Sequence, residues 1–363
     1  MKELICKNII QLKPYVAGKP IEEVKRQLGL MEVIKLASNE NPLGPSPKAI
    51  SIVKKNLARI NRYPDSNCFY LKLKLAKVHN LTPECFTIGN GSDELIDIII
   101  KTFVEEDENI ITAETTFLEY EIISKVNNRS CIRVPLKYHK FDLEGIEKKV
   151  NKKTKLIFIA NPNNPTGTYI NRPELLHFLA ELPKWVIVVL DEAYDTFIDV
   201  DDFPFGTDLI RSRRNIIVLK TFSKSYGLAG LRVGYAVAQP ELISFMERVR
   251  QPFNVNLLAQ LAAEAALDDK DFLEKTRKLI LEEKNFLYKK LRELGVNYIP
   301  SVANFILLDV GRDGCEVFKE MLKFGVIVRD MEQYGLSNFI RVTIGIREEN
   351  KKFLSALKKV IKR

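Results

Sequence analysis

The chain has 363 residues, of which 46% are hydrophobic and 28% are charged, a composition typical of a globular protein large enough for two domains. No apolar run reaches the roughly 20 residues that cross a bilayer, and the first residues lack the features of a signal peptide. The net charge of +9 is spread along the chain rather than gathered in a basic patch with interleaved aromatic residues, which argues against nucleic-acid binding. We therefore expect a cytoplasmic protein that binds neither membrane nor nucleic acid.

The cysteines and histidines argue against a disulfide framework and against a metal site. The five cysteines are odd in number and widely scattered, as expected in a reducing compartment. His79, His139 and His177 lie far apart, and none has the spacing to cysteine that binds zinc. We expect no metal ion.

The predicted elements alternate between short aliphatic strands and amphipathic helices, the pattern of a parallel sheet with crossover helices. In chain order, we predict strands at residues 85–88, 109–112, 155–160, 186–190, 216–219 and 233–237 and helices at residues 93–103, 172–181 and 240–249. The last third changes character, with a long helical stretch over 257–294, a strand at 303–308, a helix at 315–324 and strands at 326–329 and 339–344.

This change of character indicates two domains. We expect a large α/β domain over residues 48–254 and a smaller α+β domain over residues 255–363. Residues 1–47 are rich in proline, and we expect them to cross the surface as an arm that belongs with the small domain.

The segment IGNGSDELID, residues 88–97, joins a predicted strand to a predicted helix. Gly89 and Gly91 allow close backbone approach, and the free N–H groups of a helix that starts near Ser92 and Asp93 can bind phosphate. A dinucleotide fingerprint would need a third glycine where Glu94 stands. A NAD-dependent oxidoreductase is therefore disfavoured.

Two further motifs follow predicted strands. In NPNNPTG, residues 161–167, Asn164 could offer its amide to a cofactor oxygen, although the motif also suits a rigid double turn. In VVLDEAY, residues 188–194, a buried strand ends in Asp191, and burying a carboxylate without a cationic partner is costly. A pyridinium nitrogen would be such a partner, and Tyr194 could reach the phenolic oxygen of the same ring. A role for Asp191 as a helix N-cap or as a turn residue is about equally favoured by this pattern.

The segment TFSKSYGLAGLRVGY, residues 221–235, places Lys224 just beyond a strand, where open parallel sheets build their ligand sites. Thr221, Ser223 and Arg232 supply hydroxyl and guanidinium donors suited to phosphate. A lysine among such donors suits a phosphate-bearing aldehyde cofactor, because its amine can attack the carbonyl. A lone Ser-Lys pair would instead indicate an ordinary surface loop.

Taken in chain order, SNENPLGPSP, NRYPD, GNGSDEL, NPNNPTG, DEAY, SKSYGLAGLRVGY and RVTIG resemble the fold-type I aminotransferases over essentially the whole chain. NRYPD, GNGSDEL, IVRD and FIRVTIG resemble the histidinol-phosphate aminotransferases within that superfamily. The resemblance implies pyridoxal 5′-phosphate as cofactor. It also implies an α/β fold, with a mostly parallel seven-stranded sheet flanked by helices, a smaller α+β carboxyl-terminal domain and an amino-terminal arm.

The resemblance also implies roles for single residues around the cofactor. Lys224 would bind it as an imine, Asp191 would pair with its pyridinium, and Asn164 and Tyr194 would contact its phenolic oxygen. The implied ligands of its phosphate are Ser92, Asp93, Thr221, Ser223 and Arg232.

Two aromatic residues receive implied roles as well. Phe117, in ETTFLEY, would stack on the ring, with ordinary core packing as the alternative. Tyr63, in NRYPD, would reach the phosphate of the neighbouring subunit's cofactor, which implies a homodimer.

The substrate residues implied by the resemblance are Tyr15, Arg329 and Arg341, although both arginines could equally be ordinary surface residues. The implied reaction is a ping-pong transamination between L-histidinol phosphate and 2-oxoglutarate, giving imidazole acetol phosphate and L-glutamate in histidine biosynthesis. A threonine-phosphate decarboxylase and a broad aromatic aminotransferase share every cofactor residue and stay open as alternatives.

Overall fold

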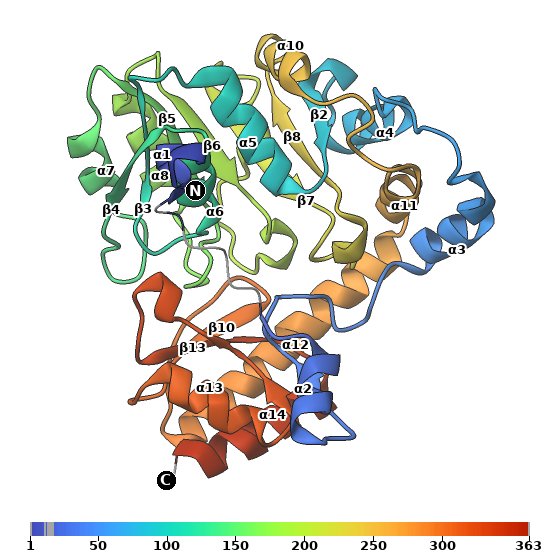
Figure 1. Ribbon diagram of the computed structural model, residues 1–363, viewed down its shortest axis with the longest axis vertical. Coiled ribbons are helices and arrows are strands. Elements are labelled where there is room, and N and C mark those ends of the chain that lie inside the picture. Colours follow the sequence, from blue (N-terminus) through green and yellow to red (C-terminus); the bar gives the residue numbers. More distant parts are fainter. Residues whose placement is uncertain (1, 11, 13–17, 362–363) are drawn as a thin grey trace.

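The structure is a computed structural model that describes residues 2–10, 12 and 18–361. Figure 1 shows an upper lobe, which we call the large domain, and a lower lobe, which we call the small domain. The long helix α12 (Lys270–Leu294) runs from the upper lobe into the lower one. In the described part of the chain, no helix combines the length and the apolar character needed to cross a bilayer.

The large domain is built on a seven-stranded sheet with the order β2-β8-β7-β6-β5-β3-β4. Its strands are β2 (Phe86–Gly89), β3 (Asn109–Ala113), β4 (Ser130–Val134), β5 (Thr154–Ala160), β6 (Ile187–Asp191), β7 (Ile216–Thr221) and β8 (Gly234–Ala238). Only β8 runs antiparallel to its neighbours, β2 and β7. The predicted mostly parallel seven-stranded sheet is confirmed, and β4 is an edge strand that the sequence analysis missed.

The central strands are apolar along nearly their whole length because both faces of the sheet are covered. Nearly every residue of β5, β6 and β7 is buried. Ala160 pairs with Asp191, and Asp191 pairs with Leu219, so the carboxyl ends of the three strands lie side by side. Polar residues that follow these strands therefore meet at one edge of the sheet.

The sheet is surrounded by helices. They are α3 (Pro47–Asn56), α4 (Phe69–His79), α5 (Ser92–Phe103), α6 (Glu119–Val126), α7 (Leu143–Lys149), α8 (Arg172–Glu181), α9 (Gly206–Leu209), α10 (Pro240–Val249) and α11 (Leu257–Leu267). The start of α8 follows from a capping box, in which Asn171 and Glu174 each accept a hydrogen bond from the other's backbone N–H.

The predicted helical stretch over residues 257–294 is confirmed, but it consists of two helices, α11 and α12, divided at Asp268 and Asp269. The carboxylate of Asp269 accepts a hydrogen bond of 2.6 Å from the Ser46 hydroxyl. Helix α11 packs against α3 and α4, and its alanines belong to the core of the large domain. We propose that the domain boundary lies after α11 rather than at residue 254.

The small domain has a four-stranded sheet in the order β12-β13-β10-β9. Its elements are β9 (Asn297–Ile299), β10 (Phe305–Asp309), α13 (Gly314–Leu322), β11 (Val326–Ile327), β12 (Arg329–Asp330), β13 (Phe339–Thr343) and α14 (Arg347–Ile361). Helix α14 buries Phe353, Leu357 and Val360 on one face and turns its basic residues outward, which is the arrangement its spacing predicts.

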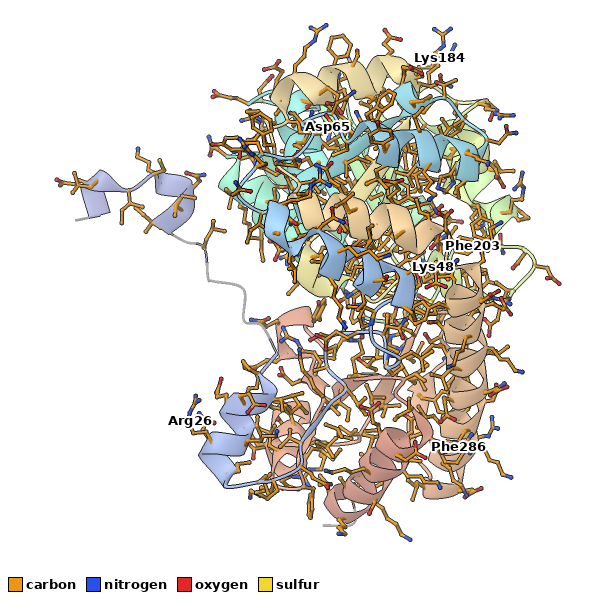
Figure 2. All side chains as sticks on the ribbon, turned by 90° about the vertical axis from the view of Figure 1, so that its right-hand side faces the viewer. Arg26, Lys48, Asp65, Lys184, Phe203 and Phe286 are labelled. Atoms are coloured by element: carbon orange, nitrogen blue, oxygen red, sulfur yellow. The ribbon has the colours of Figure 1, made fainter. Side chains whose placement is uncertain are left out.

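The amino-terminal segment joins the two domains. Helix α1 (Lys7–Ile10) contacts α6, and α2 (Ile21–Leu28) and β1 (Ile34–Lys35) pack on the small domain, where β1 pairs with β11. Figure 2 shows Arg26 of α2 in the same lobe as Phe286 of α12. We expected this segment to cross the surface, and that is wrong for part of it, because Leu36, Ala37 and Asn39 are buried.

The different burial of two neighbouring leucines on α8 predicts different effects on stability. Leu175 is fully buried in the core of the large domain, whereas its neighbour Leu176 is 39% exposed. We expect Leu175→Ala to lower the free energy of unfolding by about 2–5 kcal/mol, through lost burial and a residual cavity. Leu176→Ala should lower it by less than about 1 kcal/mol. Denaturant unfolding of the two variants checks this, and equal losses would contradict the placement of α8.

Candidate active site

A cavity of about 260 Å³ is lined by residues at the carboxyl ends of β5, β6 and β7 and by residues of the small domain. Most of the residues predicted from the sequence line this one cavity: Ser92, Asp93, Phe117, Asn164, Asp191, Tyr194, Thr221, Ser223, Lys224, Arg232, Arg329 and Arg341. The fold thus brings together side chains from segments far apart in the sequence.

Lys224 lies just beyond the end of β7, and its Nζ donates a hydrogen bond of 3.1 Å to the backbone oxygen of Ser38. Burial and then the guanidinium of Arg341 lower the pKa of Lys224 to about 8, because both disfavour the charged amine. A neutral amine, which a nucleophile or base requires, is therefore available near neutral pH. At the same strand end, Thr221 Oγ1 accepts a hydrogen bond of 3.1 Å from the Ser223 N–H.

Asp191 is the buried last residue of β6. Its Oδ1 accepts from the Ala193 N–H at 3.1 Å, and its Oδ2 accepts from the Tyr120 hydroxyl at 2.6 Å. Burial raises the pKa of Asp191 to about 6, since the ionised carboxylate loses its hydration there. The helix N-cap alternative is wrong, because the next helical turn, η4 (Asp195–Phe197), has Tyr194 at its N-cap position. The turn alternative is confirmed, because the side chain of Asp191 accepts a hydrogen bond from the N–H two residues further on.

The predicted phosphate-binding residues surround the amino-terminal end of α5, whose first residue is Ser92. Nη2 of Arg232 lies 3.1 Å from Oδ2 of Asp93. Gly91 precedes the helix with a φ of 83°, and a Cβ atom there would lie 2.5 Å from Nη2 of Arg232. Glycine at this position therefore allows the guanidinium of Arg232 to approach the start of the helix, where it and the free N–H groups together attract an anion.

Two arginines reach the cavity from the small-domain sheet, where Arg329 and Arg341 are partners in the register of β12 and β13. Arg341 donates to the Ala37 backbone oxygen at 2.7 Å and to Oδ1 of Asn164. Its buried Nε has no hydrogen-bond partner among the described residues. Arg329 donates to Oε1 of Gln333 at 3.1 Å. Both side chains are buried, so the alternative of ordinary surface arginines is wrong.

These features agree with comparisons to known proteins. The family model of aminotransferase class I and II matches residues 31–357. The chain belongs to this family.

The relatives that the chain matches include histidinol-phosphate aminotransferases. That of Moorella thermoacetica is 48% identical over 354 residues, covering 97% of this chain and 92% of the relative. That of Caldicellulosiruptor saccharolyticus is 46% identical over 350 residues, covering 96% of this chain and 98% of the relative. The crystal structure of histidinol-phosphate aminotransferase from Sinorhizobium meliloti in complex with pyridoxal-5′-phosphate has a TM-score of 0.91 and 28% identity, covering 99% of this chain and 97% of that chain.

Asn39 is a cavity residue that the sequence analysis did not single out. Its Nδ2 donates a hydrogen bond of 2.9 Å to the hydroxyl of Tyr194, and its own backbone N–H donates to Oγ1 of Thr343 at 2.9 Å. Burial raises the pKa of Tyr194, so that its hydroxyl stays protonated and can donate to a ligand. Asn39 lies within SNENPLGPSP, but nothing in that motif links it to a tyrosine 155 positions away.

Aromatic residues line the cavity as well. Phe117 contacts the edge of Tyr120, with ring centroids 5.5 Å apart and an interplanar angle of 83°. Phe117 lies against both the cavity and the core of the large domain, so both of its predicted roles stay open. Tyr120 and Tyr334 also line the cavity. The sequence analysis identified neither, although Tyr120 ends the segment ETTFLEY in which Phe117 was singled out.

The two remaining predicted residues are Tyr63 and Tyr15. Tyr63 is not among the cavity residues. Its side chain is 82% exposed and stacks on Phe253 with ring centroids 4.7 Å apart. Tyr15 lies outside the described residues. The roles predicted for both stay predictions.

The lowered pKa of Lys224 can be tested in protein stripped of cofactor. Because the neutral amine is the reactive form, labelling of Lys224 by an amine reagent should rise with pH with a midpoint near 8. At pH 7 roughly a tenth of this amine would be neutral, compared with less than about 0.1% for an ordinary lysine. Peptide mass spectrometry after brief labelling measures the midpoint, with Lys278, whose side chain is 73% exposed, as reference. A midpoint above about 10 would contradict the burial argument.

Proposed function

We propose that the protein catalyses transamination between L-histidinol phosphate and 2-oxoglutarate, giving imidazole acetol phosphate and L-glutamate, with pyridoxal 5′-phosphate as cofactor. The observation that carries this proposal is one cavity with Lys224 and Asp191 on one side and Arg329 and Arg341 on the other. Relatives of that name at 48% and 46% identity support the choice of substrate.

The residues around the cavity fit this cofactor. Pyridoxal phosphate, when bound, supplies an aldehyde that condenses with amines and a ring that takes up the electrons released at the substrate's Cα. Gly91 allows the guanidinium of Arg232 to lie close to the start of α5, where the free N–H groups and this cation suit a phosphate. The buried carboxylate of Asp191 suits a protonated ring nitrogen, and the amine of Lys224 suits the aldehyde.

Lys224 carries the proton that leaves the substrate's Cα. Its amine, with a pKa lowered to about 8, can be neutral at working pH, accept the proton from the substrate's Cα and return it later in the cycle. Asp191 holds a positive charge on the ring nitrogen, because an ionised carboxylate that is buried gains most from a nearby cation. Asn164 and Tyr194 present an amide and a protonated hydroxyl to the same cavity, where we propose that they contact the phenolic oxygen.

The two arginines can explain how one site binds both glutamate and histidinol phosphate. Glutamate carries a carboxylate at the position where histidinol phosphate carries a phosphomethyl group, and one guanidinium fork can bind either anion. The Nε of Arg341 is buried and has no hydrogen-bond partner in the part of the chain that the structure describes. This supports an anion at this place, because a buried N–H donor is costly to leave unpaired. We propose that Arg329 adds the second positive charge that favours the dianionic phosphate.

The substrate assignment can be tested with the cofactor-loaded enzyme. We expect histidinol phosphate to convert the bound cofactor to its amine form with a higher kcat/KM than threonine phosphate or phenylalanine, because only that substrate satisfies both the proposed phosphate site and the aromatic walls. Stopped-flow absorbance of each half-reaction measures this. If histidinol phosphate were the poorest of the three, the proposed substrate would be wrong, whereas the cofactor assignment would stand.

The role of Lys224 can be tested by substitution. Lys224→Ala should lower the transamination rate by about 10²–10⁴-fold or more, because it removes the group that carries the proton. Borohydride treatment of the wild-type protein should attach the cofactor to Lys224, as read by peptide mass spectrometry. The exposed Lys278→Ala serves as control and should leave both results unchanged. Lys224→Ala that turned over at the wild-type rate would contradict the mechanism.

We propose further that the protein is a homodimer in which Tyr63 contacts the cofactor phosphate of the neighbouring subunit. Large apolar side chains are exposed near Tyr63, which favours a protein partner over solvent. They are Leu57, Ile60, Phe69, Tyr70 and Phe253.

The expected cytoplasmic location stays a prediction.

Subunit mixing tests this arrangement. Lys224→Ala and Tyr63→Ala each damage both sites of their own dimer, but a mixed dimer contains one site with both residues intact. After the two variants are dissociated together and reassociated, activity should recover to about a quarter of the wild-type value, since half of the dimers are mixed and each has one intact site. Light scattering confirms the dimer. No recovery from a confirmed mixed dimer would mean that Tyr63 serves its own subunit.

A further inference from the structure

Tyr120 lines the cavity and contacts Asp191, but it has no assigned role so far. It is the second residue of α6 and is fully buried. Its hydroxyl donates to Oδ2 of Asp191 at 2.6 Å, while Oδ1 of the same carboxylate accepts from the Ala193 N–H at 3.1 Å. Each carboxylate oxygen has one donor from the protein, and a carboxylate has room for further partners on the side that lines the cavity.

The ring of Tyr120 is held on several sides. It stacks on Phe158 of β5 with centroids 4.9 Å apart and an interplanar angle of 11°, and Phe117 meets it edge to face. Its backbone oxygen accepts a hydrogen bond of 2.6 Å from the Ser124 hydroxyl. A side chain fixed in this way loses little further entropy when it orients another group.

The chemical type of the donor also matters. Burial, and then the charge of Asp191, raise the pKa of Tyr120 well above its ordinary range, so the phenol remains a neutral donor at any working pH. A lysine or arginine in its place would neutralise the carboxylate and compete with a ring nitrogen for its charge. A neutral hydroxyl orients the carboxylate without neutralising it.

We propose that Tyr120 is a positioning residue that acts through Asp191: its hydroxyl fixes the carboxylate in the orientation that faces the cavity and leaves its negative charge available to the ring nitrogen of the cofactor. This inference rests on the proposed cofactor, but not on the identity of the phosphorylated substrate. Removal of the hydroxyl frees the carboxylate to rotate and makes it a stronger base, which draws the proton away from the ring nitrogen.

The test is Tyr120→Phe, which keeps the ring and removes only the hydroxyl. We expect the affinity for pyridoxal phosphate and the rate constant of the glutamate half-reaction each to fall about ten- to hundredfold, the usual effect of losing a hydrogen bond to a charged group, with KM for glutamate nearly unchanged. The absorbance of the lysine-linked cofactor changes with pH, and the midpoint of this change should lie at higher pH in the variant. The reason is that a less protonated ring withdraws less charge from the linkage to the lysine. Tyr235→Phe is the matched control, because Tyr235 is also buried and its hydroxyl pairs with Nε2 of His79 at 2.9 Å.

A double-mutant cycle separates positioning from packing. If Tyr120 acts through Asp191, adding Tyr120→Phe to Asp191→Asn should change cofactor affinity by less than about twofold. Three outcomes would each overturn the inference. Tyr120→Phe could lower cofactor affinity as much in the Asp191→Asn background as in the wild type, it could by itself leave affinity and the titration midpoint at their wild-type values, or Tyr235→Phe could have an equal effect. If Tyr120→Phe does not fold, Phe158→Leu is the alternative test, because it loosens the ring of Tyr120 but keeps its hydroxyl. It should move the titration midpoint in the same direction by a smaller amount, and an unchanged midpoint would contradict the inference. A wild-type protein that neither binds the cofactor nor reacts with glutamate would refute the proposed function instead.

Discussion

Burial of the Asp191 carboxylate at the end of β6 is the constraint on which the rest of the site depends. A carboxylate taken out of water must find donors and positive charge, or it becomes protonated. The protein supplies two neutral donors, from Tyr120 and the Ala193 backbone, and leaves its pKa raised to about 6. The carboxylate is therefore prepared for a cationic ligand, and the neighbouring strand ends bring Lys224 to the same cavity.

The strand ends are held in register by a second buried cluster behind the site. Lys220, which precedes Thr221 on β7, pairs with Glu192 at 2.7 Å and also with Asp195. Glu192 directly follows Asp191, so this cluster ties the end of β6 to the end of β7. A buried ion pair contributes little net stability, because desolvation offsets its attraction. Its effect here is geometric, since breaking it would leave a buried charge unpaired and displace the residues beside it.

The segment over residues 37–39 links the two domains at the cavity. Lys224 donates to the backbone oxygen of Ser38, and Arg341 donates to that of Ala37. Asn39 contacts Tyr194 of the large domain and Thr343 of the small domain. A relative movement of the two domains would therefore change the surroundings of the proposed base and of the proposed anion-binding arginine together.

The sequence by itself determined the sheet and most of the candidate site. Continuous apolar runs predict buried parallel strands, and β5, β6 and β7 lie where those runs predicted. Polar residues directly after such strands must meet at one edge of the sheet, which is why Asn164, Asp191 and Lys224 could be placed together before the structure was known.

The tertiary structure alone decided the contacts between segments with no shared pattern. The edge strand β4 is only partly buried, so its apolar signal is weak. The break between α11 and α12 depends on packing against α3 and on the contact of Asp269 with Ser46. Tyr120 and Asn39 meet their partners only after folding, 71 and 155 residues away along the chain. A periodic pattern reports which face of an element is buried, but it does not report which distant side chain lies against that face.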